Sequence, residues 1–146
     1  MATKDLFNNI KTAMMATPAV QTTTLTSAAV STAGYQSAVV LFDVGNSADT
    51  LSGSVYWTLS LTECATLAGS YTAVAAANVI VDGGTLDTTS TYVIDAPLED
   101  TIVVKFGYRG SLGFIKGVAT ATGTHSTGTP IGIISVLGDA HILPVS

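Results

Sequence analysis

Charged residues are scarce in this chain. Only 10% of its 146 residues are Asp, Glu, Lys or Arg, against a usual share of about a quarter. The surface of the folded protein must therefore consist largely of hydroxyl groups, small side chains and backbone. Because 47% of the residues are hydrophobic and few charges keep molecules apart, we expect another protein to cover part of this surface in a working assembly.

Basic side chains are especially few, and they are not clustered. The chain has five Lys and Arg residues against ten Asp and Glu, which gives a net charge of -5. The basic residues are dispersed along the sequence: Lys4, Lys11, Lys105, Arg109 and Lys116. Recognition of phosphate groups needs grouped Lys and Arg side chains, so this pattern argues against nucleic acid as a partner.

The sequence also lacks paired cysteines and long apolar runs. Cys64 is the single cysteine, which excludes an internal disulfide and fits folding in a reducing compartment. No apolar run approaches the roughly 18 residues of a membrane-spanning helix, and the first residues carry no long apolar core ahead of a cleavage site. We therefore expect neither a classical export signal nor insertion into a membrane.

Residues that support catalysis or bind metals are equally scarce. The chain has two histidines, His125 and His141, and two glutamates, with no spacing that joins them into a zinc site. No serine lies in a pattern with His and Asp that would activate it as a nucleophile. We expect no metal, no cofactor and no enzymatic activity.

Two acidic segments are compatible with a binding role but are more simply explained as loops. Asp43, Asn46 and Asp49 are spaced three apart, as in a loose calcium loop, yet the alternating ligands and closing glutamate of an EF-hand are missing. A plain turn is the preferred interpretation. The densest acidic patch, in residues 95–100, is typical of a solvated loop, although it could also receive a basic arm from a neighbour.

What the chain does contain is a series of short strand-like segments. From residue 20 onward, runs rich in Val, Ile, Thr, Tyr and Phe are bounded by Gly, Asn, Asp and Pro, which is typical of strands separated by turns. The predicted strands are 20–25, 38–44, 53–61, 71–74, 91–94, 101–108, 114–121 and 131–137. Such strands, without alternating helices, predict one all-β domain over residues 19–146, an antiparallel β-sandwich of jelly-roll-like form.

Two segments of this domain allow more detailed predictions. Residues 54–61 alternate strictly between polar and apolar, which places Trp57 on the apolar face, where it should anchor the core. Residues 73–80 combine helix-favouring Ala with strand-favouring Val and Ile, and we interpret them as a strand end that leads into a loop.

The first 18 residues form a separate segment in this interpretation. The apolar residues Leu6, Phe7, Ile10 and Met14 recur at spacings that would line one face of a short helix between residues 3 and 15, before Pro18 interrupts it. Such a helix would pack on its own domain. The same segment could instead be an arm that is ordered only by a neighbour. In that case the four apolar residues, together with Lys4 and Lys11, are the candidate contacts with a partner.

Short sequence blocks at three places in the chain form a characteristic combination. They are Ala33–Val40; Asp49–Tyr56 followed by Leu59–Glu63 and Ser70–Val74; and Gly107–Gly110 together with the C-terminal stretches Gly123–Gly132 and Val136–Val145. This combination resembles a family of small tailed-bacteriophage structural proteins encoded near the major capsid gene. In that family a Gly-Thr-Pro-Ile-Gly-like strand entry precedes a Gly-Xaa-Xaa-His-Xaa-Xaa-Pro-Val-like terminus.

The resemblance implies a virion component made in the host cytoplasm. The role it implies is that of a capsid decoration (cement) protein, which binds the major capsid protein on the outer capsid surface as a homotrimer and stabilises the mature lattice by mass action. We place the contact between copies at His141 and Leu143 near the C-terminus.

Two other classes of function remain open at this point. A head-tail connector, a tail protein or a fibre-base protein would also be a β-rich oligomer with little chemistry, and a ring symmetry other than threefold would support it. A carbohydrate-binding β-sandwich would show exposed aromatic platforms, for which the candidates are Tyr35, Tyr56, Tyr71, Tyr92 and Tyr108. Packing in the core or in an interface explains these tyrosines equally well.

Overall fold

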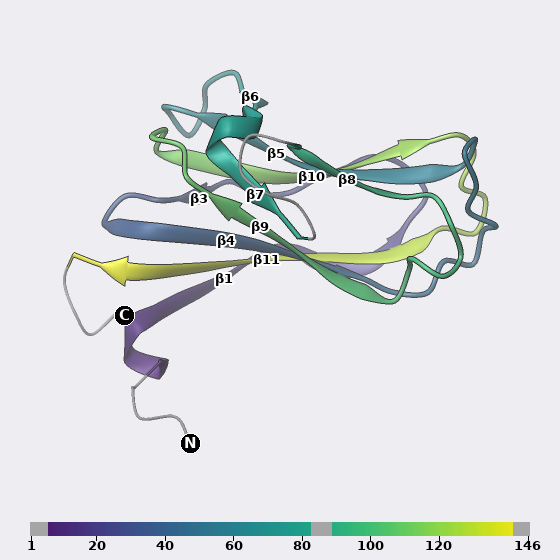
Figure 1. The fold of residues 1–146 in the computed structure, drawn as a ribbon, viewed down its shortest axis with the longest axis horizontal. Coiled ribbons are helices and arrows are strands. Elements are labelled where there is room, and N and C mark those ends of the chain that lie inside the picture. The colour runs from purple at the N-terminus through teal and green to yellow at the C-terminus, as the bar shows by residue number, and fades with distance from the viewer. Residues whose placement is uncertain (1–5, 83–88, 142–146) are drawn as a thin grey trace.

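Strands make up most of the regular structure in the computed structural model, which describes residues 6–82 and 89–141. They form two antiparallel sheets that pack face to face, and the only helical elements among the described residues are two short 3-10 turns (Figure 1). The predicted all-β fold and the antiparallel β-sandwich are confirmed.

The first sheet, sheet A, has five strands and contains the longest strands of the molecule. Its order is β1-β11-β4-β9-β7, so β1 and β7 are its edges. The strands are β1 (Ile10–Gln21), β11 (Thr129–Ala140), β4 (Tyr35–Val44), β9 (Ile102–Tyr108) and β7 (Val79–Val81). Every pair of neighbours in this sheet is antiparallel.

The second sheet, sheet B, has six strands built around the central pair β10 and β5. One side of β10 is lined by the two-residue strands β2 and β3, and β5 pairs with β6 and β8. The strands are β2 (Leu25–Thr26), β3 (Val30–Ser31), β5 (Tyr56–Cys64), β6 (Thr72–Ala73), β8 (Thr91–Ile94) and β10 (Phe114–Thr122).

The core lies between the two sheets, where alternate residues of each long strand point inward. In β5 these are Trp57, Leu59 and Leu61, each at most 1% exposed, as the alternation predicted. Trp57 also keeps its polar atom satisfied, because its indole N–H donates to the hydroxyl of Thr129 at 2.9 Å. From sheet A, Phe42 and Phe106 contribute an edge-to-face aromatic pair with ring centroids 5.1 Å apart.

The N-terminal segment is a strand, and the predicted helix is wrong over the described residues. A single 3-10 turn, η1 (Phe7–Asn9), leads directly into β1, which pairs with β11 along its length. Ile10 and Met14 are four residues apart, a spacing that brings side chains to one face in a helix and in a strand alike. Pairing with β11, which is distant in sequence, decides between the two.

Pro18 interrupts the register of this strand rather than ending it. The pairing of β1 with β11 shifts between Ala16 and Ala19, which is where Pro18 lies. A proline is tolerated at such an irregularity on an edge strand because no ladder hydrogen bond is lost. Residues 10–18, predicted to lie outside the sandwich domain, are therefore an integral part of sheet A.

Two further predicted segments differ from the structure in their boundaries. The predicted strand 20–25 covers the last residues of β1, a turn and the first residue of β2. Residues 73–80 were expected to leave β6 as a loop; instead they form the 3-10 turn η2 (Ala76–Asn78) and then enter β7 at the edge of sheet A.

Candidate interaction face

The outer face of sheet A, which points away from sheet B, is apolar. Directly paired residues in a sheet point to the same side, so the register gives the outward rows. One row runs Met14, Ile134, Leu41 and Lys105 across four strands. The next runs Thr12, Val136, Val39, Gly107 and Ile80 across all five.

We call this surface the apolar face. Its apolar members come from every strand of sheet A: Ile10, Met14, Val39, Leu41, Ile80, Val103, Ile134 and Val136. Met14, Val103 and Ile80 are exposed by 57%, 50% and 39%, and the others are half-buried. Apolar side chains thus adjoin one another across β1, β11 and β4, and Val103 and Ile80 add apolar surface on β9 and β7. Such a grouping is typical of interaction surfaces.

Charge on the apolar face is low and partly neutralised. Among the described outward residues of sheet A, Lys105 and Asp43 are the charged ones. The Lys105 ammonium group lies 3.6 Å from a carboxylate oxygen of Asp82, at the end of β7. A partner that covers this face therefore has few charged groups to desolvate.

The outer face of sheet B has a different chemistry. In β5 the outward residues are Tyr56, Thr58, Ser60 and Thr62, and those of β10 are Phe114, Lys116, Val118, Thr120 and Thr122. Hydroxyl groups therefore alternate with inward apolar side chains, which is the usual pattern of a sheet with one face in water. The two sides of the sandwich are thus chemically distinct, and the apolar face is the exceptional one.

The residues predicted as partner contacts are distributed around one edge of this face. Met14 lies on it, and Ile10 is half-buried in its last row next to Gly138. Leu6 and Phe7 lie just before β1 and are 66% and 86% exposed. Lys11 is exposed but alternates to the other side of the strand, and Lys4 lies outside the described residues.

One of the two residues of the predicted contact between copies lies outside the described residues. His141 is exposed at the end of β11, and its backbone N–H donates to the carbonyl oxygen of Gly34 at 2.9 Å. Leu143 is not among the described residues. The interface role of both residues stays a prediction.

The members of the apolar face on the central strands β4 and β11 were not predicted from the sequence to point outward. Val39, Leu41, Ile134 and Val136 were assigned to strands without a side, because most of their neighbours along the strands are also apolar; Ser135 is the exception. The available signal was the nearly continuous apolar run itself, since such runs are typical of strands covered on both faces.

Polar side chains at one end of the sandwich hold loops together. The carboxylate of Asp49 accepts backbone N–H groups of Thr127 at 2.9 Å and Gly128 at 2.6 Å, and these bonds lower its pKa below the usual range. The ring of His125 stacks on Trp57 with centroids 4.5 Å apart, and its Nδ1 lies 3.8 Å from Asp49. Residues 43 and 44 end β4, and residues 45–49 form a loop that these hydrogen bonds fasten to the hairpin before β11.

A cluster of metal-binding side chains is not evident in the part of the chain that the structure describes. No group of three or more His, Cys, Asp and Glu side chains comes together there. The two histidines do not meet, since His125 lies in the hairpin before β11 and His141 follows its far end.

Glu63 and Tyr108 form a buried polar pair near the other end of the sandwich. The Tyr108 hydroxyl donates to a carboxylate oxygen of Glu63 at 2.5 Å, and the two residues are 7% and 9% exposed. Burial, together with the hydrogen bond to Glu63, raises the pKa of Tyr108 above its ordinary value. This pair links β9 of sheet A to β5 of sheet B and is a structural bond between the sheets.

The tyrosines do not form an exposed platform. Tyr108 is buried, and Tyr35, Tyr56, Tyr71 and Tyr92 are half-buried. The Lys116 ammonium group covers the Tyr71 ring at 4.0 Å from its centroid. The five tyrosines that were the candidates for carbohydrate binding therefore do not form an open surface on which a sugar ring could stack.

Comparison with known proteins gives no relative: no family model, no curated protein and no solved structure matches this chain. Within residues 6–82 and 89–141, no helix is long and apolar enough to cross a membrane.

Proposed function

We propose that the protein is a non-enzymatic virion component, a capsid decoration protein that binds the outer surface of a capsid through the apolar face and stabilises the lattice. The observation that carries the proposal is the contrast between the two sheets. Sheet B presents mainly hydroxyl groups to the outside, with fewer apolar side chains (Phe114, Val118 and Val93), whereas sheet A is apolar toward the core and largely apolar toward the outside. The choice of a capsid as the partner is supported by the sequence resemblance alone.

The physical argument for binding is the area that contact would remove from water. Full burial of a Val, Leu, Ile or Met side chain contributes about 1.5–3 kcal/mol. Met14 and Val103 are each roughly half exposed, so burying the rest contributes roughly 1 kcal/mol for each. Repeated around a lattice, such contacts would favour the intact shell over the broken one by mass action.

A matched pair of substitutions tests the role of the apolar face. Val103→Lys places a charge on it, and Val93→Lys places the same charge on the outer face of sheet B, where Val93 is 43% exposed against 50% for Val103. We expect Val103→Lys to lose binding to capsids of the virus that encodes the chain and Val93→Lys to keep it, in a co-sedimentation assay with particles that lack the protein. Equal binding by both variants would contradict the role of this face.

Location in the particle tests the capsid itself as the partner. A particle reconstruction should show density for the chain on the outer shell, with the apolar face toward the capsid. Density confined to the tail or to one vertex would instead assign a connector or tail role. Truncation experiments should remove residues 1–9 rather than 1–18, because the longer deletion also removes most of β1 and thus an edge of sheet A.

A further inference from the structure

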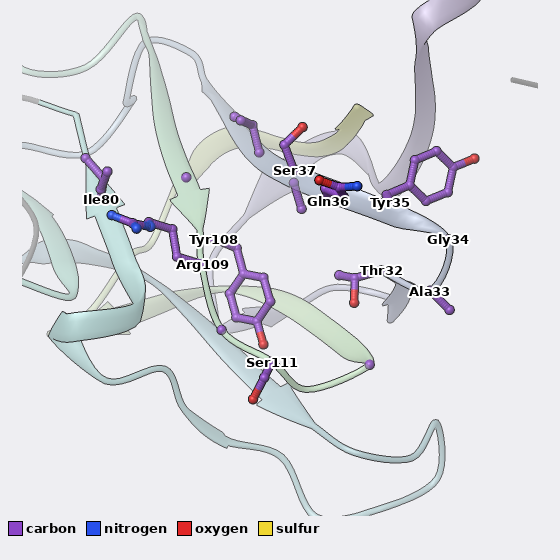
Figure 2. Close-up of a pocket in the computed structure, with 15 residues that line it drawn as sticks. Thr32, Ala33, Gly34, Tyr35, Gln36, Ser37, Ile80, Tyr108, Arg109 and Ser111 are labelled. Carbon is purple, nitrogen blue, oxygen red and sulfur yellow. The ribbon is translucent and has the colours of Figure 1, made fainter. Parts of the chain in front are cut away.

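A cleft of about 720 Å³ lies at the end of sheet A where β4 begins and β9 ends (Figure 2). Such a volume is typical of clefts that hold a drug-sized ligand, and it has room for the tip of a loop rather than for one side chain alone. In the outward row of β4, β9 and β7, Gly107 lies between Val39 and Ile80. Because Gly107 has no side chain, the sheet is hollow between the apolar side chains of Val39 and Ile80, which we call the floor of the cleft. Other residues that line the cleft are polar, among them Gln36, Ser37 and Ser111.

The rim of the cleft carries one positive charge. Arg109 is the only charged residue among the described ones that line it. Figure 2 shows its side chain extended toward Ile80. Arg109 is exposed, and its guanidinium group forms no ion pair with a described residue. An apolar floor beside an unpaired guanidinium group fits an apolar side chain that has carboxylates next to it.

The chain itself presents such a group at the other end of sheet A. Leu98 is 98% exposed, the highest value among the large hydrophobic side chains of the described residues. Its loop contains Asp95, Glu99 and Asp100. The loop is preformed, because the Glu99 carboxylate accepts the backbone N–H groups of Asp95 at 2.9 Å and Ala96 at 3.2 Å.

The loop cannot reach the cleft of its own molecule. The loop lies just before β9, and the cleft lies where β9 ends, so the seven residues of β9 separate the two. At about 3.3 Å per residue the strand spans roughly 20 Å. The Leu98 loop could therefore occupy this cleft only in another molecule.

We propose that Leu98 of one copy seats over Gly107 of the next copy, with its acidic loop facing Arg109. The contact joins two different surfaces of the same chain, so it is heterologous and gives a ring when the rotation between copies closes. This inference goes beyond the proposed function by naming a contact between copies, and it does not depend on what the apolar face binds.

Sedimentation of the isolated full-length protein over a concentration series tests the contact. Leu98→Asp should weaken association about tenfold or more, as expected for the loss of an anchoring side chain. Leu67→Asp is the matched control, because Leu67 is also an exposed loop leucine, at 61%, but adjoins neither surface. Circular dichroism and Trp57 fluorescence check that each variant is folded.

A charge exchange tests the pairing of the two surfaces. Arg109→Glu should weaken association, and the second substitution Asp95→Arg should restore it, since the signs are then reversed on both sides. Asp95 can be replaced without loosening the loop, because the Glu99 carboxylate makes the hydrogen bonds that fix the loop and the Asp95 carboxylate makes none within the loop.

Gly107→Trp should also block the contact by filling the cleft. A Cβ atom at Gly107 would meet only ordinary contacts, the nearest at 3.8 Å, so the fold should accept the new side chain.

Three results would overturn the inference: a wild-type protein that is monomeric throughout the series, a Leu98→Asp variant that associates like the wild type, or a charge exchange that restores nothing. A monomer whose cleft binds a small molecule would equally reject it. None of these results depends on capsid binding, which the Val103→Lys and Val93→Lys pair measures separately.

Discussion

The hydrogen bond between Tyr108 and Glu63 should be one of the polar contacts that contribute most to the stability of the protein. The substitution Tyr108→Phe keeps the ring in place and removes only the hydroxyl group. That hydroxyl donates to the buried Glu63 carboxylate at 2.5 Å and accepts the backbone N–H of Leu112 at 3.1 Å. The variant therefore leaves a buried carboxylate and a partly buried N–H group without this partner.

The expected loss follows from these two contacts. A hydrogen bond to a charged group contributes about 1.5–3 kcal/mol, and an unsatisfied buried donor costs about 1 kcal/mol or more. We expect the free energy of unfolding to fall by about 2–4 kcal/mol. For a chain of 146 residues this corresponds to a decrease in Tm of roughly 5–12 °C.

Urea unfolding followed by Trp57 fluorescence measures this loss, because Trp57 is the single tryptophan and lies in the core. Tyr92→Phe is the control: Tyr92 is half-buried, and its hydroxyl has no hydrogen-bond partner among the described residues. The double variant Tyr108→Phe with Glu63→Met should recover part of the loss, since both polar partners are then replaced by apolar groups.

The same pair predicts a dependence on alkaline pH. Because the folded state raises the pKa of Tyr108, the stability that its neutral hydroxyl contributes is present below the ordinary tyrosine pKa and is lost as pH rises through the raised value. The difference in the free energy of unfolding between the wild type and the Tyr108→Phe variant should therefore become smaller above about pH 10. A Tyr108→Phe variant as stable as Tyr92→Phe at neutral pH would refute the reasoning.

Two further substitutions probe the opposite end and the middle of the sandwich. Hydrogen bonds lower the pKa of Asp49 in the folded state, so the stability that its carboxylate contributes is present above about pH 4 and is lost as pH falls below that value. Acid unfolding curves of the Asp49→Asn variant should lack this loss of stability. Curves that match those of the wild type would contradict this role of Asp49. Gly117→Ala should cost about 1–3 kcal/mol by overpacking, because its Cβ would lie 3.0 Å from two core side chains; Gly113→Ala, with its nearest contact at 3.7 Å, should cost less in the same denaturant titration.

The alternation of apolar and polar residues within a single strand could be predicted from the sequence, whereas the pairing of strands distant in sequence could not. Trp57, Leu59 and Leu61 alternate with hydroxyl residues, so both the strand and its buried side follow from the local pattern. The segment around Met14 has spacings that fit a helix and a strand, and the partner that settles it, β11, lies more than a hundred residues away. Two-residue strands such as β2 carry almost no local signal, because they form through pairing with β10 alone.

The candidate face was hidden from the sequence for a related reason. In the run 38–42 every residue is apolar, so no alternation shows which side points to the core. The structure buries Val40 and Phe42 and turns Val39 and Leu41 outward. The cleft at Gly107 needs the register of three strands, and the Leu98 loop is recognised only by its exposure.

The apolar runs in sheet A also bear on what the protein does. A strand with one face in water needs apolar residues only at alternate positions, as in β5, and additional apolar residues on the wet face lower solubility without stabilising the fold. Yet β4, β9 and β11 each carry outward Val, Leu or Ile residues. Runs of this kind are typical of strands that are covered on both sides. Among the residues that the structure describes, sheet B covers only the inner face of sheet A and no element covers the outer one, which is why we propose a partner for the apolar face.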